Sequence, residues 1–312
     1  MSINISPSIK FAISPRQMIS IKFQFTRLVC STRILLKNSS SSSNRWLNRQ
    51  HNDFYTRKAK EENLKSRAAF KLLQIDEKFH LFSKNKLMNV LDLGAAPGAW
   101  NQVAIERSAK GSKVLGVDLL PYQPPIGASA IQGNILNKET HRLIKDYFIL
   151  SSLERKDKVF EELEVISASG RHTKISESSV LEKEIEASVL LNESKERDID
   201  TDMRHKYPVD VVLSDMMANT SGLAIKDHGM SMDLCDAALI AAIDLLKKDG
   251  SLVMKFFTGE EDKSLEKRLN QVFRTVRRFK PKACRLESKE SYFICLKKKD
   301  YEFDKIKLFT GL

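Results

Sequence analysis

A glycine-rich segment that could bind a ligand follows an apolar run near residue 90. It reads LDLGAAPGAW over residues 91–100. Its small residues let the backbone pass close beneath a ligand, so it predicts a binding turn at the carboxyl edge of a sheet. About 20 residues later, Asp118 stands where a carboxylate can accept both ribose hydroxyls of an adenosine. The turn lacks GxGxxG, which favours an adenosyl group over a dinucleotide. A tight packing turn is the structural alternative.

Apolar strand-like segments alternate with helical segments around this turn. The expected strands are Met88–Leu93, Lys113–Leu119, Ala130–Gln132, Val209–Asp215, Ser251–Phe257 and Ser291–Leu296. A helical pattern runs from Asp53 to Phe82, and further helices are expected near Trp100–Ser108, Glu139–Phe148, Met230–Lys247 and Lys263–Val272. Apolar strands separated by helices imply a mostly parallel sheet covered on both faces. The fold class is therefore predicted to be α/β and doubly wound.

The first 50 residues differ in composition from the rest of the chain. They hold eight Lys or Arg, no Asp or Glu, and a serine run over residues 39–43. This composition is typical of a mitochondrial transit peptide and linker, and it predicts delivery to the matrix. A basic RNA-binding arm is the alternative. Residues 51–312 are then expected to form a single catalytic domain.

A charged segment at residues 151–206 interrupts that domain. It carries 14 Asp or Glu against 10 Lys or Arg and few aromatic residues, which predicts a surface insertion. The whole chain has a net charge of +12, and a basic surplus favours polyanionic partners. Cys30, Cys235, Cys284 and Cys295 form no CxxC pair, so we expect reduced thiols and no metal site. No apolar run approaches the roughly 18 residues that a membrane span needs.

Five ordered motifs carry a family resemblance. They are SRAAFKL, DLGAAPGAW, VDLLP, SDMMANTSG and MKFF, distributed over residues 53–150 and 207–299. In this order they resemble the FtsJ/RrmJ family of RNA ribose 2′-O-methyltransferases. The resemblance implies a Rossmann-like methyltransferase fold and S-adenosyl-L-methionine as cofactor. It also implies a Lys-Asp-Lys-Glu catalytic set, which maps onto Lys71, Asp215, Lys255 and Glu290.

The implied reaction explains why these residue types belong together. A ribose 2′-hydroxyl is a poor nucleophile until its proton is removed. Lys255 is assigned as the base, and a neighbouring cation such as Lys71 or partial burial would favour its unprotonated form. Asp215 would orient that amine beside the methyl donor, while Lys71 and Glu290 would position the 2′-oxygen. Taken singly, each residue could instead serve a solvated helix face, a turn cap or a local ion pair.

The resemblance also implies cofactor contacts at Gly98, Trp100, Asp118, Asn134 and Asp215. The glycine-rich turn adds Gly94, Ala95 and Pro97 to the predicted cofactor-binding residues. Three positions depart from the family pattern. Asn134 stands where Asp is usual, Met217-Ala218 replaces Ala-Pro, and Ala99 replaces Gly or Ser. None of these departures removes a catalytic group.

The RNA partner is inferred from charge. Residues 263–299 hold 13 Lys or Arg against three acidic residues, and basic residues also recur through the N-terminal helical pattern. If both segments flank the cofactor edge, they form a basic rim for phosphates; a solvated charged surface is the alternative. The resemblance to organellar members of the family implies a uridine of mitochondrial large-subunit rRNA, within a ribosomal precursor particle, methylated by a monomer. Methylation of a tRNA anticodon-loop ribose, or a ribosome assembly role, is the alternative.

Overall fold

A seven-stranded sheet organises the computed structural model, which describes residues 53–151, 206–219, 221–299 and 302–310. The strand order is β3-β2-β1-β4-β5-β7-β6. These strands are β1 Asn89–Leu93, β2 Lys113–Asp118, β3 Ala128–Gln132, β4 Val209–Ser214, β5 Leu246–Phe257, β6 Phe273–Phe279 and β7 Glu290–Lys298. All neighbours pair in parallel except at β7, which is antiparallel to both β5 and β6. The predicted mostly parallel α/β sheet is confirmed.

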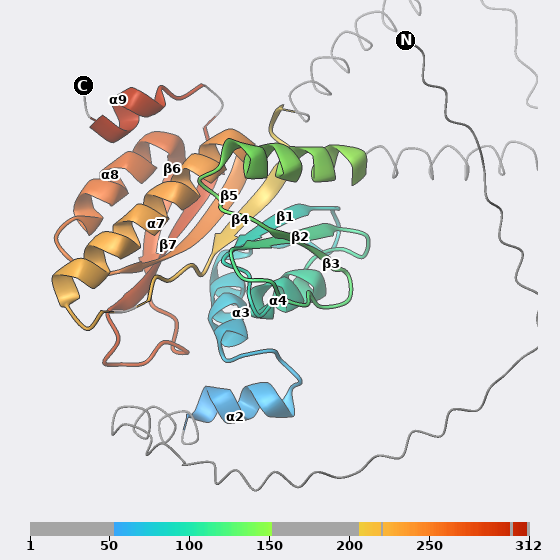
Figure 1. Ribbon diagram of the computed structural model, residues 1–312. Coiled ribbons are helices and arrows are strands. Elements are labelled where there is room, and N and C mark those ends of the chain that lie inside the picture. The colour runs from blue at the N-terminus through green and yellow to red at the C-terminus, as the bar shows by residue number, and fades with distance from the viewer. Residues whose placement is uncertain (1–52, 152–205, 220, 300–301, 311–312) are drawn as a thin grey trace, which may run out of the picture. The chain divides into compact units, whose positions relative to one another are not determined.

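Helices cover both faces of this sheet (Figure 1). They are α2 Phe54–Glu61, α3 Ala68–Phe79, α4 Ala99–Arg107, α7 Ala224–Leu245, α8 Asp262–Val272 and α9 Lys305–Thr310, together with a helix over residues 138–151. Side chains alternate between the faces along each strand. In β1, Val90 joins a core with α3 and α4, while Leu91 and Leu93 join the core beneath α7 and α8. This alternation explains why the strands are apolar throughout.

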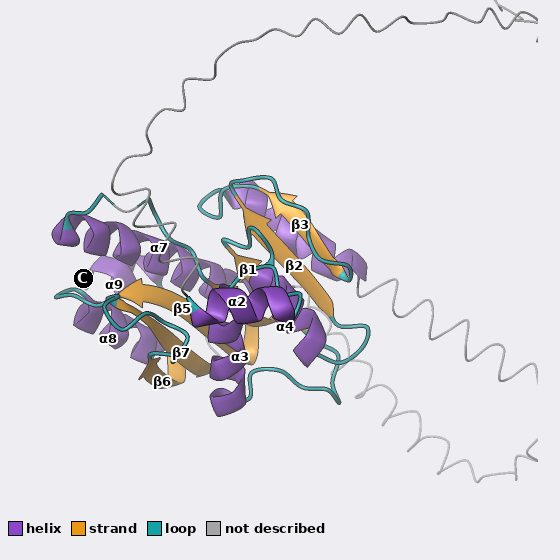
Figure 2. Cartoon of the chain, turned by 90° about the horizontal axis from the view of Figure 1, so that it is seen from below, coloured by secondary structure: helices purple, strands orange, loops and turns teal. Residues whose placement is uncertain are grey.

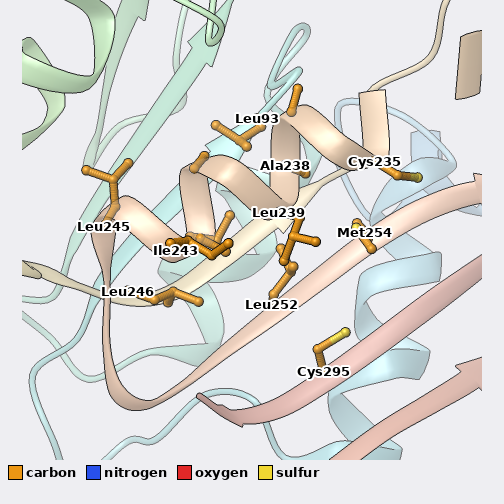
Figure 3. Close-up of a cluster of buried hydrophobic side chains, with 14 of the residues drawn as sticks. Leu93, Cys235, Ala238, Leu239, Ile243, Leu245, Leu246, Leu252, Met254 and Cys295 are labelled. Atoms are coloured by element: carbon orange, nitrogen blue, oxygen red, sulfur yellow. The ribbon is translucent and has the colours of Figure 1, made fainter. Parts of the chain in front are cut away.

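The larger core lies between the sheet and α7 (Figure 3). Ala238, Leu239 and Ile243 of α7 pack with Leu252 and Met254 of β5, and all five are at most 5% exposed. An amphipathic helix buries such a stripe against a strand. This packing fixes α7 against β5, the strand that carries Lys255.

The N-terminal helical pattern is two helices rather than one. Residues 62–67 leave the helical conformation between α2 and α3, and Asn63 has φ +55°. Asp53 caps α2 by accepting a hydrogen bond from the Thr56 amide at 2.9 Å. α2 contacts α3 (Figure 2). Phe70 of α3 forms a small core with Ala59 of α2 and with Ala283.

One strand was not predicted from the sequence. β6 lies at the sheet edge with the sequence FRTVRRF, and its three arginines are exposed. Charged edge strands resist pairing with other chains. β5 also begins five residues before the predicted Ser251, because Leu246 pairs with Val209 before the register shifts.

Two of the sequence-based predictions fall mostly outside the described residues. The transit peptide and linker at residues 1–50 lie there, as does nearly all of the insertion predicted at residues 151–206. The chain enters that interval from the helix at 138–151 and leaves it into β4. In the part of the chain that the structure describes, no helix combines the length and apolarity of a membrane span.

Candidate active site

The glycine-rich turn connects β1 to α4 at the carboxyl edge of the sheet. The Gly94 amide donates to the Val117 carbonyl at 2.9 Å, which ties the turn to the end of β2. Gly94 has φ +72°, and a Cβ there would lie 2.7 Å from the Met216 side chain and 3.0 Å from its Cα. Gly98 caps α4 with φ +100°. Both glycines therefore meet a conformational requirement that other residues would satisfy only with strain. Ala95 is buried and Pro97 is exposed on the same turn.

Asp118 stands at the end of β2 and is only partly buried. One of its oxygens accepts from the Ala96 amide at 2.9 Å and the other from the Leu120 amide at 2.8 Å. A carboxylate oxygen has room for more than one donor, so both retain the capacity to accept a ribose hydroxyl. Asn134 is exposed after β3, and its side-chain oxygen accepts from the Leu136 amide at 3.0 Å.

A buried polar chain lies beneath this turn. Asn101 of α4 donates to Asp92 of β1 at 2.8 Å and accepts from the Tyr122 hydroxyl at 2.7 Å. Burial, then the nearby Asp215 and Asp118, raise the pKa of Asp92 well above its ordinary value, which favours the protonated form of its carboxyl group. The second oxygen of Asp92 has no hydrogen-bond partner among the described residues. The sequence analysis did not single out this chain, although Asp92 stands in the DLG motif.

The four residues of the predicted catalytic set meet at the carboxyl ends of β4 and β5. Lys255 Nζ lies 3.1 Å from Asp215 Oδ1 and donates to the Asp215 carbonyl at 2.6 Å. Lys71 Nζ, from α3, lies 4.0 Å from Asp215 Oδ2 and 2.5 Å from Glu290 Oε1. Residues 219 positions apart in the sequence are thereby brought into contact. Asp215 is the shared centre of two lysine contacts.

The charges in this cluster are fixed by their neighbours. Burial alone would raise the pKa of Asp215, but Lys255, Lys71 and a hydrogen bond from Tyr292 outweigh it and lower that pKa. Burial opposes the charged form of Lys71, yet Asp215 and Glu290 raise its pKa above the ordinary value. At neutral pH the cluster therefore holds an ionised Asp215 and a protonated Lys71.

Tyr292 is a further member of the cluster that the sequence analysis missed. Its hydroxyl lies 2.8 Å from Asp215 Oδ1 and 2.5 Å from Glu290 Oε1, and the side chain is fully buried. Burial and both carboxylates raise its pKa well above the ordinary value, so it remains a donor. Its position in SKESY, two residues after Glu290 on the same face of β7, was the available signal.

Trp100, one of the predicted cofactor contacts, has its indole in the core. The side chain is 3% exposed, its Nε1 donates to the Ala68 carbonyl at 2.9 Å, and its ring centroid lies 5.8 Å from that of Tyr292. Only its backbone, in the first turn of α4, is left to contact a cofactor. The indole instead joins α4, α3 and β7.

The two basic segments of the predicted rim are in contact. Arg67 forms an ion pair with Asp53 and donates to the Ala283 carbonyl at 2.6 Å. The Ala283 amide donates in turn to the Gln74 side chain at 2.9 Å. These bonds attach the segment between β6 and β7 to α2 and α3. Exposed cations on the joined segments include Arg57, Lys60, Lys65, Lys282 and Lys289.

The described cysteines Cys235, Cys284 and Cys295 are buried and free, as the sequence analysis expected. Burial and the nearby Glu290 raise the pKa of Cys284 to about 12, so its thiol is protonated beside the cluster.

Comparison with known proteins identifies the family. Residues 64–298 match the FtsJ-like methyltransferase family. The chain is 47% identical to "rRNA methyltransferase 2, mitochondrial" of Saccharomyces cerevisiae, over 89% of this chain and 94% of that protein. It is 35% identical to the protein of the same name from Schizosaccharomyces pombe, over 81% and 95%. It is 32% identical to "Ribosomal RNA large subunit methyltransferase E" of Rickettsia canadensis, over 83% and 90%. Since the family match spans the glycine-rich turn and the whole Lys-Asp-Lys-Glu cluster, this chain belongs to the FtsJ-like methyltransferases.

Proposed function

We propose that this protein methylates a ribose 2′-hydroxyl of ribosomal RNA, using S-adenosyl-L-methionine. The observation that carries the proposal is the cluster of Lys71, Asp215, Lys255 and Glu290 beside the glycine-rich turn. It combines the Lys255 amine, the ionised Asp215 carboxylate and the protonated Lys71 at one edge of the sheet. A hydroxyl nucleophile needs those groups for orientation and for proton removal.

The turn and the end of β2 fit the cofactor. Asp118 offers two carboxylate oxygens that each carry a single backbone donor, which suits the two hydroxyls of an adenosine ribose. The turn would hold the methionine part through Gly94, Ala95, Pro97 and Gly98, and Asn134 would meet the adenine. When bound, S-adenosyl-L-methionine supplies a methyl group that is already activated by its sulfonium charge.

The residues of the chain then have distinct tasks. Lys255, in its unprotonated form, accepts the proton of the 2′-hydroxyl. Asp215 holds the Lys255 amine in place through its carboxylate and its backbone carbonyl. Lys71 remains charged and, with Glu290, positions the 2′-oxygen. Tyr292 fixes the two carboxylates relative to each other. Their joint effect is the alignment of oxygen and methyl group that a displacement reaction requires.

The names of the relatives guide the choice of substrate and compartment. Two fungal relatives are named as mitochondrial rRNA methyltransferases and a bacterial relative as a large-subunit rRNA methyltransferase. We therefore propose a uridine of mitochondrial large-subunit rRNA, modified in the matrix within a precursor particle by a monomeric enzyme. The joined basic segments would bind phosphates, which give affinity without reading sequence. A tRNA target has no comparable support.

Mapping 2′-O-methylation tests this proposal directly. Mitochondrial rRNA and tRNA from a strain lacking the gene are compared with those of the parent strain and of a strain that expresses Lys255→Ala. Loss of one methylated uridine in large-subunit rRNA, restored by the wild-type gene and not by the variant, is expected. Unchanged rRNA with a lost tRNA methylation would contradict the proposed substrate.

A further inference from the structure

A shallow apolar recess lies beside the catalytic cluster, at the carboxyl ends of β4 and β5. Its volume is about 250 Å³ including the open mouth, and its lining includes Met216, Met217, Met230, Phe257 and Lys255. The lining comes from three elements, namely the segment after β4, the start of α7 and the end of β5. Lys255 is the only residue that belongs to both the recess lining and the predicted catalytic set.

Two side chains at the start of α7 hold the walls of the recess. Asp227 accepts from the Ser221 amide at 2.7 Å, from its hydroxyl at 2.8 Å and from the Gly222 amide at 3.2 Å. His228 accepts from the Glu261 amide at 3.2 Å, so its other nitrogen carries the hydrogen and donates to the Phe257 carbonyl at 2.9 Å. The hydrogen bonds of Asp227 fix the segment after β4, and those of His228 fix the end of β5. The recess is therefore preformed.

The recess and the basic segments lie on opposite sides of the cluster. Lys71 comes from α3, which packs on one face of the sheet, while Met230 belongs to α7 on the other face. Lys255 and Asp215 lie at the edge between them. A nucleotide whose ribose lies at this edge would direct its phosphates toward one face of the sheet and its base toward the other. Its phosphates match the exposed cations near α2 and α3, and its base is left to face the recess.

We propose that the recess receives the base of the nucleotide that is methylated. This inference rests on the proposed function and deepens it, because it assigns the site that selects a nucleoside. A flat heteroaromatic ring is suited to thioether and phenyl surfaces, which interact well with π systems. The carboxylate of Asp227 is already engaged by three donors, so the lining offers little to a phosphate. The recess is shallow and open, which suits stacking of a flat base on its surface rather than enclosure of a whole nucleotide.

Occupation of the recess requires the target to leave its stack. Enzymes that act on a base accept unpaired residues or extrude them, and sequence-specific reading of RNA targets mostly loops and other unpaired bases. The recess would stabilise the extruded base and hold the 2′-hydroxyl near Lys255 at the same time. The enzyme then selects the nucleotide whose base can be unstacked where the RNA is bound.

A photocrosslink and a kinetic cycle test the assignment. The probe is an rRNA fragment that contains the methylated nucleotide, with 4-thiouridine at that position or with the base removed. We expect the thiouridine to crosslink to the lining, and Met217→Ala to lower single-turnover methylation about tenfold on the intact fragment, in the range of one lost stacking contact. On the abasic fragment the same variant should change nothing. Ile225→Ala is the matched control, since Ile225 is 91% exposed on the first turn of α7 and does not line the recess.

The outcomes separate this inference from the proposed function. If the wild type methylates the fragment but thiouridine crosslinks elsewhere, or if Met217→Ala slows the intact and abasic fragments equally, the base does not lie in the recess. If the wild type methylates no RNA fragment at all, the proposed function fails and the inference falls with it. Binding of S-adenosyl-L-methionine, measured in parallel, should be the same for the wild type and both variants.

Discussion

Two aspartates at the same edge of the sheet have pKa values shifted in opposite directions. Asp92 belongs to β1 beneath the cofactor turn, and Asp215 directly follows the neighbouring strand β4. Asp92 is 1% exposed, accepts one hydrogen bond from an uncharged amide and has a raised pKa. Asp215 is also largely buried, yet two lysines and a tyrosine lower its pKa. Burial alone would make both neutral, so the neighbouring cations decide which one is ionised.

This difference divides the site by task. The region of β1, β2 and α4 offers backbone groups, uncharged side chains and one accessible carboxylate, which suits binding of a small cofactor. The region of β4, β5 and β7 concentrates charged groups that are held by one another, which suits proton transfer. The two regions meet where Asp92 and Asp215 interact through space.

The largest expected effect comes from removing the proposed base, Lys255. Lys255→Ala should reduce methyl transfer by about 10²–10⁴-fold, since general-base catalysis contributes on that scale. Binding of cofactor and RNA should stay within a few-fold, because the loss falls on the transition state. Single-turnover methylation of an rRNA fragment measures the rate, with Lys110→Ala as control because Lys110 is exposed between α4 and β2. Rapid turnover by Lys255→Ala would refute the assignment.

Removing the charge of Asp215 should cost stability as well as activity. In Asp215→Asn the Lys255 amine keeps a carbonyl acceptor but loses its carboxylate, and the protonated Lys71 loses one of its two carboxylates. Breaking a buried ion pair from one side costs roughly 3–5 kcal/mol. Chemical denaturation of this variant is compared with that of Asp233→Asn, which changes an exposed position of α7. Equal free energies of unfolding would show that Asp215 carries no net charge in the fold.

The cofactor region should respond in affinity rather than in turnover. Asp118→Ala removes the acceptors proposed for the ribose hydroxyls, each worth roughly 1.5–3 kcal/mol as a charge-assisted bond. We expect calorimetry to show weaker binding of S-adenosyl-L-methionine and little change in RNA affinity. Asp146→Ala, on the exposed face of the helix at 138–151, serves as control. Unchanged cofactor affinity would place Asp118 outside the site.

Much of this arrangement could be predicted from the sequence because its signals are local. Apolar segments of strand length, the glycine-rich turn and Asp118 depend on spacing along the chain, and they predicted β1, α4 and β2 closely. The contact of Lys71 with Glu290 could not be worked out in this way, since it joins residues 219 positions apart. It was implied only by family resemblance.

Features that depend on tertiary context were missed. β6 has three arginines in seven residues and resembles a polar loop until its edge position is known. Tyr292 and the indole of Trp100 could each be core or site residues, and only packing shows that both contact the cluster or its supports. The raised pKa of Asp92 likewise follows first from its burial, which only the fold shows.

The raised pKa of Asp92 can be tested by measuring the free energy of unfolding as a function of pH. Its raised pKa means that the folded protein keeps a proton that the unfolded chain loses above its ordinary value of 3.8. The free energy of unfolding attributable to Asp92 therefore falls as pH rises from about 4 toward the raised pKa, by about 1.4 kcal/mol per pH unit. Asp92→Asn keeps an acceptor for Asn101 and removes this dependence. Denaturation at several pH values should show the stability of the variant, relative to that of the wild type, rising as the pH increases above about 4. A difference that is constant with pH would mean that Asp92 keeps its ordinary pKa in the folded protein.

The smallest effect is expected at Trp100, which connects the two regions. Its Nε1 donates from α4 to the Ala68 carbonyl at the start of α3, the helix that carries Lys71, and its ring lies near Tyr292. Trp100→Phe keeps an aromatic ring but removes the donor, so we expect a loss of about 1 kcal/mol in the free energy of unfolding. Because Lys71 would be held less firmly, methyl transfer should fall only a few-fold, with unchanged affinity for S-adenosyl-L-methionine. A large loss of cofactor affinity at unchanged stability would instead show that the indole contacts the cofactor, and the two regions would then share a binding residue.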